Sequence, residues 1–218
     1  MPIARYGLRH DRQHLNGLAQ SNSLTYCWTV PYWISVGDRG NDIYDYVLGA
    51  TGEGWDYVVR VKHDRTVTVD GEKKRLHAWV RSLEHGAEHE LDLRARGDKF
   101  SRKAKIKIAW GKALMEPPKG KPGKEVPVTY IRVHDPEDAD LEWILVTSLK
   151  VSSEEEAITV VQVYEKRWVI EEYHKCLKTG CRIEDAQLRT GKRLLALLGI
   201  LGIIATQLLQ LRNRPTIS

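Results

Sequence analysis

The stretch Tyr164–Lys178, YEKRWVIEEYHKCLK, decides how the rest of this 218-residue chain is interpreted. On a helix, Tyr164, Arg167, Glu171 and Lys178 fall at roughly 0°, 300°, 340° and 320°, since each residue turns the chain by about 100°. The four side chains then share one face. A carboxylate flanked by two cations and a phenol is typical of a site that binds a divalent metal and phosphate groups. The alternative is a surface helix with ordinary charge pairs.

The beginning of this helix is also predicted. Ser152 or Ser153, followed by Glu155 and Glu156, is typical of a helix N-terminus, because their side-chain oxygens accept hydrogen bonds from free amides. We expect four apolar side chains to pack the helix onto a sheet, namely Ile158, Val161, Trp168 and Leu177.

The composition is compatible with a DNA partner but does not require one. Lys and Arg number 34 against 29 acidic residues, which gives a net charge of +5, a modest excess. The three cysteines, Cys27, Cys176 and Cys181, are odd in number and favour a reducing cytosol over a disulfide scaffold. A single Cys-x4-Cys pair argues against zinc. Charged residues interrupt any apolar leader at the start of the chain.

A buried strand is predicted at Tyr32–Gly37, with Asp38 directly after it. A carboxylate just past the carboxyl end of a strand is a frequent position for chemistry in α/β sheets, and the alternative is a turn or capping role. Asn41 or Asp42, with Asp42 favoured, is then predicted to cap a helix. The apolar face of that helix would consist of Ile43, Tyr44, Val47 and Leu48.

Two further strands carry candidate residues. The run Trp55–Lys62 predicts a half-buried strand with Arg60 and Lys62 on one face, where they could also be solvated edge cations. The run Leu141–Thr147 predicts a buried strand with Trp143 near its start, a position that is usually core or rim packing.

Residues 66–140 predict a β-rich insertion. A helix at Leu76–Glu84 is followed by short strands at His89–Arg94, Lys103–Trp110 and Val126–Val133, with a Pro, Gly and Lys linker before the last. In the middle strand Lys103, Lys105 and Lys107 alternate with Ala104, Ile106 and Ile108. Its basic face could lie along DNA or simply be solvated.

The two ends of the chain differ in character. Residues 1–30 are polar and predict an irregular segment, with a weak helical pattern at Asp11–Ala19. Leu194–Leu209 is apolar all round but shorter than the ~20 residues that a membrane span needs. We therefore predict a buried core helix and no membrane.

The spacing Tyr-x2-Arg-x3-Glu-x6-Lys resembles the YREK signature of bacterial DDE transposases of the insertion-sequence-four group, the transposon-five-like enzymes. The run Gly37–Tyr44, GDRGNDIY, is similar to the Gly-Asp-Arg-Glu-x-Asp-Ile-Tyr segment of that family. The strands that contain Arg60 and Trp143 resemble its Val-Val-Arg-x-Lys and Trp-Leu-Leu-Leu-Thr strands. The resemblance covers most of the chain from about Trp33 onward.

This resemblance implies an α/β, ribonuclease-H-like core that cuts and rejoins DNA by two-metal phosphoryl transfer. Asp38 and Glu171 match the second and third catalytic carboxylates, which would hold Mg2+ with Mn2+ as a substitute. The residues that match DNA contacts of the family are Arg60, Lys62, Trp143, Tyr164, Arg167 and Lys178. Among them, Trp143 matches the residue that stacks on a flipped base.

The expected organisation is an irregular segment at 1–30, a core at 31–65 and 141–218, and the insertion at 66–140. The first catalytic aspartate of the family is expected to be absent, because Asp11 is the single acid before Asp38. We therefore expect a truncated chain without its first strands, with an exposed sheet edge, weak stability and doubtful activity.

The expected partners are double-stranded DNA at transposon ends and either full-length transposase or a second copy, in the cytoplasm of a bacterium beside the nucleoid. The alternative is a catalytically inactive DNA-binding or inhibitory fragment, or a remnant without a role. An unrelated nuclease on a ribonuclease-H-like sheet is a third possibility, against which the YREK spacing counts.

Overall fold

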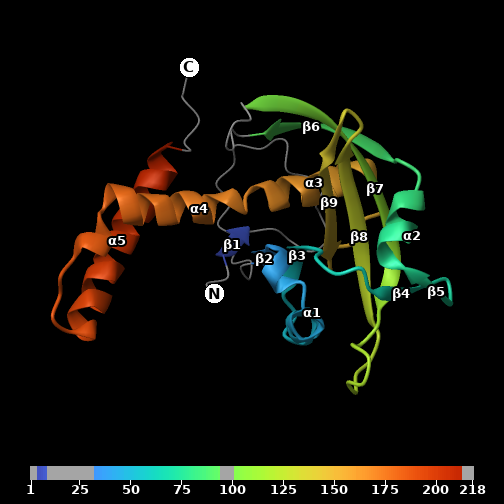
Figure 1. Cartoon of the computed structure of the whole chain (residues 1–218), viewed down its shortest axis with the longest axis horizontal. Coiled ribbons are helices and arrows are strands. Elements are labelled where there is room, and N and C mark those ends of the chain that lie inside the picture. Colours follow the sequence, from blue (N-terminus) through green and yellow to red (C-terminus); the bar gives the residue numbers. More distant parts are fainter. Residues whose placement is uncertain (1–3, 9–31, 94–100, 213–218) are drawn as a thin grey trace, which may run out of the picture. The chain divides into compact units, whose positions relative to one another are not determined.

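The computed structural model describes residues 4–8, 32–93 and 101–212. The chain divides into two compact units, Met1–Glu165 and Lys166–Ser218. The first unit is a mixed α/β domain, in which helices cover a sheet of nine strands (Figure 1). The described part of the second unit, up to Arg212, consists of helices and their short connections. The expected α/β class is thereby confirmed for the first unit.

The sheet has the order β1-β2-β3-β9-β8-β7-β4-β5, and β6 also pairs with β7. Only β2 and β3 are parallel among the described pairs. The strands are β1 Ala4–Leu8, β2 Tyr32–Gly37, β3 Asp56–Arg60, β4 Thr66–Val69, β5 Glu72–Arg75, β6 Ala87–Leu93, β7 Arg102–Met115, β8 Val126–Asp135 and β9 Asp138–Thr147. Each strand predicted from the sequence is present.

Two apolar clusters fill the two faces of this sheet. Helix α3, Glu154–Glu165, packs on one face, where Val161 and Tyr164 meet residues such as Ile131 and Leu145. Helices α1, Tyr44–Gly52, and α2, Leu76–Ser82, cover the other face. Alternation along β9 explains the division, because neighbouring side chains point to opposite faces.

The first helix begins differently from the prediction. Its N-cap is Ile43, which makes no side-chain capping bond, so the predicted cap at Asn41 or Asp42 is wrong. Asp42 is instead buried and bound to the segment after β3. The start of α3 confirms its prediction: Ser153 Oγ accepts from the Glu156 amide at 3.3 Å, and the Glu156 carboxylate accepts from the Ser152 amide at 2.6 Å.

The lysine face of β7 is paired with acids. Ala104, Ile106 and Ile108 are buried as predicted. On the opposite face, Lys103, Lys105 and Lys107 stand across from Asp92, Glu90 and Glu88 of β6. Lys103 Nζ lies 2.5 Å from Glu90 Oε1. Because each cation faces a carboxylate, this strand offers little net positive charge to DNA, and solvation of the lysines is the favoured alternative.

The amino-terminal prediction is partly wrong. Residues 4–8, expected to be irregular, form β1, which pairs antiparallel with β2 and is the terminal strand on that side of the sheet. The weak helical pattern at Asp11–Ala19 lies outside the described residues. The strands of residues 66–140 continue the same sheet as β2 and β3, and the division into core and insertion remains a prediction.

In the second unit, α4 spans Trp168–Lys175 and continues into a π-helical turn, Cys176–Gly180. A short 3-10 helix, Ile183–Asp185, precedes α5, Gly191–Arg212. The predicted helix over Tyr164–Lys178 is therefore not one regular α-helix. Trp168 is 37% exposed, so its predicted burial is also wrong.

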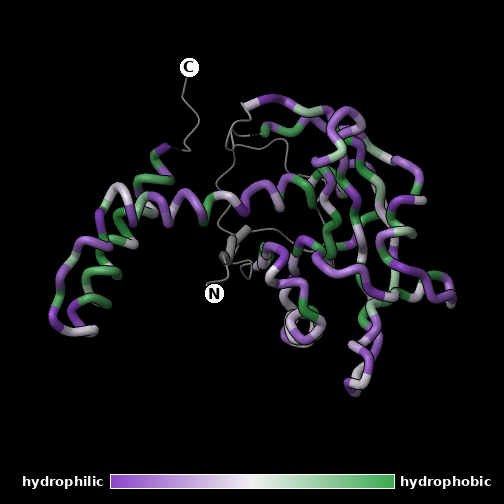
Figure 2. The backbone as a smooth tube through the Cα atoms, viewed as in Figure 1, coloured by the Kyte–Doolittle hydropathy of each residue, from purple (hydrophilic) through white to green (hydrophobic). Residues whose placement is uncertain are grey.

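The prediction of a buried last helix is wrong as well. Helix α5 has 22 residues, and within it only Ala205 is buried. Figure 2 shows hydrophobic residues along much of its length. Among the described helices, α5 alone is long and apolar enough to cross a membrane, by length and composition only. These two properties are weak evidence for a span, because helices of soluble proteins share them.

Candidate functional site

The candidate site begins where the parallel strands end. Gly37 of β2 pairs with Val59 of the parallel strand β3, so Asp38 and Arg60 lie side by side at the carboxyl ends of these two strands. In α/β sheets the carboxyl ends of parallel strands are the usual place for binding and chemistry. The structure therefore brings a carboxylate and a cation predicted from the sequence to one edge.

Asp38 is exposed and caps a turn. Its Oδ1 accepts a hydrogen bond from the Gly40 amide at 2.8 Å, at the start of the 3-10 helix Arg39–Asn41. Gly37 is closely packed, since a Cβ there would lie 2.7 Å from Asn41 Cβ. The capping role is present, and it leaves the carboxylate accessible from solvent. A catalytic role for Asp38 remains a prediction.

Three of the predicted DNA-binding residues are in contact with one another. The Arg60 guanidinium lies 5.9 Å from the centre of the Trp143 ring. The Trp143 and Tyr164 rings meet edge to face, with centroids 5.3 Å apart. We call these residues the Arg60–Trp143–Tyr164 stack. A cation beside an aromatic ring is attracted to it, so the stack holds a partly exposed indole in a fixed environment.

The members of the stack differ in exposure. Tyr164 is only 5% exposed and belongs to the apolar core under α3, whereas Trp143 is partly buried against that core. Trp143 can therefore offer surface to a ligand, and Tyr164 supports it from behind. A phosphate contact by Tyr164 remains a prediction.

Sequence reasoning missed an internal ion pair beside Lys62. The Asp42 carboxylate accepts from the Lys62 and His63 amides at 2.7 and 3.0 Å and pairs with the Arg65 guanidinium. Its side chain is fully buried. Asp42 thus connects the turn after Asp38 to the segment after β3, on which Lys62 is exposed. The second aspartate of the Gly37–Tyr44 run, Asp42, was the sequence feature that could have indicated this ion pair.

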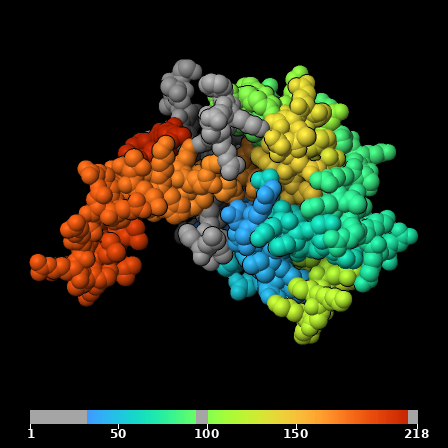
Figure 3. Space-filling view, viewed as in Figure 1, coloured from blue at the N-terminus to red at the C-terminus, as the bar shows by residue number. Residues whose placement is uncertain are grey.

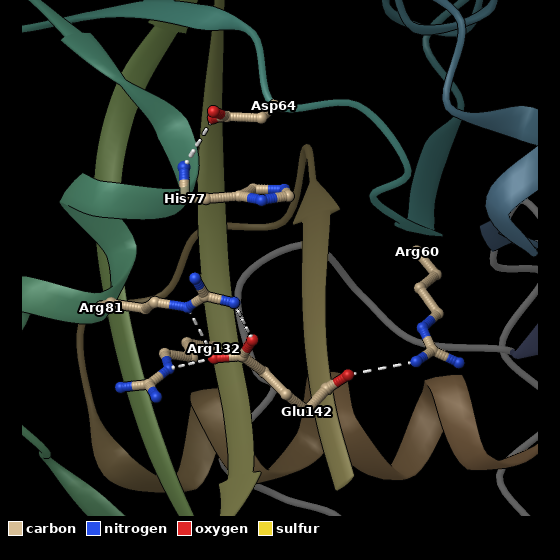
Figure 4. Close-up of polar contacts among 6 residues, drawn as sticks. All are labelled: Arg60, Asp64, His77, Arg81, Arg132 and Glu142. Atoms are coloured by element: carbon tan, nitrogen blue, oxygen red, sulfur yellow. Dashed lines mark hydrogen bonds and ion pairs between the residues drawn. The ribbon is translucent and has the colours of Figure 1, made fainter. Parts of the chain in front are cut away.

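A second missed group lies at the start of β9 (Figure 4). The Glu142 carboxylate accepts from Arg81 Nη2 at 2.5 Å and from Arg132 Nε at 2.8 Å. Hydrogen bonding from Arg81, opposed by partial burial and reinforced by Arg132, lowers the pKa of Glu142 to about 2. The Glu142 main-chain carbonyl accepts from Arg60 Nη2 at 3.1 Å. Because side chains alternate along a strand, the sequence could have indicated that Glu142 lies on the face of the sheet opposite to Trp143.

The remaining signature residues lie in the second unit. Arg167 Nη1 is 2.8 Å from Glu171 Oε1, one turn apart on the helix, and Glu171 is 43% exposed at its side chain. Lys178 Nζ pairs with Glu184 at 2.8 Å, which raises the pKa of the lysine. The ordinary charge pair expected as the alternative is therefore present. A metal shared by Glu171 and Asp38 remains a prediction.

Asp38 in the first unit and Glu171 in the second each present an accessible carboxylate, and carboxylate oxygen is the kind of ligand that a hard divalent cation prefers. Within the described ranges, however, no three His, Cys, Asp or Glu side chains gather into a metal-binding group. Metal binding by Asp38 and by Glu171 therefore stays a prediction.

A carboxylate, a cation and an aromatic side chain thus lie near the carboxyl ends of the two parallel strands of a mixed α/β domain. The family model of the transposase DDE domain matches residues 7–208. The chain therefore belongs to the DDE transposase family. Transposases of this family act on DNA, and they generally use divalent metal ions. The family assignment confirms the coarser part of the sequence-based identification.

Proposed function

We propose that this chain is a bacterial cut-and-paste transposase of the insertion-sequence-four group, with a ribonuclease-H-like core that binds double-stranded transposon ends. The observation that supports the proposal best is the Arg60–Trp143–Tyr164 stack at the edge where Asp38 follows β2. Family membership alone would not require a tryptophan between an arginine and a signature tyrosine at that edge.

Each side chain has a proposed task. Arg60 and Lys62 neutralise phosphate oxygens near the cleaved end, and Arg167 and Lys178 do so from the second unit. Trp143 stacks on a base that has left the duplex, an interaction worth about 1–3 kcal/mol per base. That gain offsets the cost of unpairing the base.

The proposed cofactor is Mg2+, for which Mn2+ can substitute, held by Asp38 and Glu171. Bound there, the metal would polarise phosphate oxygens and lower the pKa of a bound water. This chain's own part is to supply oxygen ligands, and Arg167, whose Nη1 lies 2.8 Å from Glu171 Oε1, orients that carboxylate.

The second candidate is a DNA-binding chain without catalysis, which inhibits or accompanies a full-length transposase in the bacterial cytoplasm. The observation that favours it is the incomplete set of metal donors among the described residues. Arg60 and Trp143 would serve that role equally, because neither needs a metal to hold DNA.

DNA binding and cleavage can be tested separately. A salt titration of binding to duplex DNA should give a slope that falls by about 0.9 when one phosphate contact is removed. We expect Arg60→Gln and Lys62→Gln to lower the slope and Lys105→Gln, on the acid-paired face of β7, to leave it unchanged. Absence of DNA affinity at low salt would refute both candidates.

Cleavage is then assayed on supercoiled plasmid with and without Mg2+. Nicking that requires Mg2+ and is lost in Glu171→Gln supports the transposase. Binding without nicking supports the non-catalytic chain. Nicking that Glu171→Gln leaves intact would overturn the role assigned to that glutamate.

A further inference from the structure

Glu142 and Trp143 are neighbours that face opposite sides of β9. Glu142 stands across from His134 of β8, and Trp143 stands across from Val133. Trp143 packs against the apolar cluster under α3, whereas Glu142 is on the side of α2. Anything that fixes the backbone at Glu142 therefore also fixes the direction in which the indole points.

The Glu142 side chain is held by two elements. From α2, Arg81 donates through Nε at 3.1 Å and Nη2 at 2.5 Å, and from β8, Arg132 donates through Nε at 2.8 Å. The exposed fractions of the three side chains are 20% for Glu142, 53% for Arg81 and 15% for Arg132. Paired, charge-assisted bonds of this kind fix orientation as well as adding energy.

The main chain of Glu142 extends this network to the candidate site. Its carbonyl accepts from Arg60 Nη2 at 3.1 Å, and the Arg60 guanidinium lies 5.9 Å from the Trp143 ring centre. In Figure 4 the Arg60 side chain reaches from β3 toward this carbonyl, while Arg81 and Arg132 meet the carboxylate. One residue thus contacts three arginines from three elements.

We propose that Glu142 is a positioning residue that holds Arg60 and Trp143 in the arrangement that receives an unpaired DNA base. This inference rests on the proposed function, because it assigns Glu142 to the base-stacking role of Trp143. Glu142 itself touches no DNA in this scheme; it acts through its carbonyl and through the backbone it shares with Trp143. Its carboxylate stays charged at neutral pH, because the arginines hold its pKa low, so both arginine pairs persist.

A purely structural role is the competing explanation, since the same bonds join α2 to the sheet. The chain provides a matched control, because a second carboxylate, Asp64, also anchors helix α2. The Asp64 carboxylate accepts from Arg75 Nε at 3.1 Å and Nη2 at 2.9 Å, and from the His77 amide at 3.0 Å. These contacts anchor the start of α2 but do not involve Arg60 or Trp143.

The test uses the full chain and two short DNA duplexes, one fully paired and one with an unpaired 2-aminopurine near its end. Affinity is measured for both duplexes, and 2-aminopurine fluorescence reports stacking. We expect Glu142→Gln to weaken binding of the unpaired probe by about fivefold, the lower end of what base stacking contributes, and to leave the paired duplex unchanged. Asp64→Asn should alter neither affinity, although both variants lower stability.

Each outcome decides between explanations. If Trp143→Ala abolishes the preference for the unpaired probe and Glu142→Gln keeps it at the wild-type value, Glu142 is not a positioning residue. Equal losses in Glu142→Gln and Asp64→Asn would assign both carboxylates to the stability of α2 alone. If Trp143→Ala itself has no effect, the base-stacking part of the proposed function fails first.

Discussion

Replacing Asp42 by asparagine tests the buried ion pair that sequence reasoning missed. The introduced side chain would keep one oxygen for the Lys62 and His63 amides, which both donate to Asp42 Oδ2, but would leave the Arg65 guanidinium without its counter-charge. Arg65 is 17% exposed at its side chain, and its Nε has no partner. Removing one member of a buried pair costs about 3–5 kcal/mol, since the remaining charge stays in a poorly solvated place.

The magnitude is measurable by urea unfolding, followed by tryptophan fluorescence and circular dichroism. A loss of that size lowers the midpoint temperature by roughly 6–20 °C for a chain of this length. The control is Asp45→Asn, which removes the Lys121 pair at the start of α1. Both of those side chains are about 60% exposed, so we expect a loss of about 0–1 kcal/mol.

A double variant separates the charge effect from packing. Asp42→Asn combined with Arg65→Met removes the stranded charge, so part of the lost stability should return, because apolar replacement of a buried pair is often neutral. An Asp42→Asn variant that loses no more stability than Asp45→Asn would refute this reasoning. A double variant less stable than Asp42→Asn alone would refute it as well.

Three further predictions concern other features. The pKa of Glu142 is lowered to about 2 in the folded chain. Its contribution to stability is therefore present above the pKa of an unfolded glutamate and is lost as pH falls through about 2. In urea titrations, the stability difference between wild type and Glu142→Gln should shrink across that acid range. Ser153→Ala removes the cap of α3 and should cost about 1 kcal/mol, whereas a urea midpoint equal to wild type would show that Glu156 caps alone. Gly86→Ala would place a Cβ against the Trp110 ring, closer than van der Waals contact allows, and should cost about 1–3 kcal/mol by overpacking. An unchanged midpoint in thermal unfolding would contradict this.

Local patterns were sufficient for most of the elements. The alternation of polar and apolar residues over Lys103–Ile108 predicted both the strand and its buried face, because this two-residue period can be read within a single strand. The acidic partners on β6 could not be predicted in the same way. Pairing register is set between distant segments, so the neutralisation of that lysine face becomes visible only in the sheet.

The site was predicted in pieces rather than as a whole. Arg60, Trp143 and Tyr164 were chosen separately, and the structure places them in contact. Asp42 was misassigned because an aspartate before an apolar run fits a cap as well as an internal ion pair, and burial decides between the two. Glu142 carried no motif of its own, since its importance arises from three arginines on other elements.

The exposure of α5 was misjudged for a related reason. Composition showed that Leu194–Leu209 is apolar, but composition does not say what covers it. The length was underestimated because Gly191–Arg193 and the residues after Leu209 extend the helix with mostly polar side chains. Hydrophobic periodicity alone does not show where a helix begins and ends, because capping residues are needed to mark those positions.

The outermost strand, β5, has a consequence for how this protein behaves when concentrated. Its four residues, Glu72, Lys73, Lys74 and Arg75, are all charged, and β5 ends the sheet beyond β4. Figure 3 shows the side chains of this part of the chain (teal) spread over the surface. A second molecule that extended the sheet at β5 would have to pair with a strand of four charged residues and would partly desolvate their side chains. Fibre-like stacking of molecules through β5 is accordingly disfavoured.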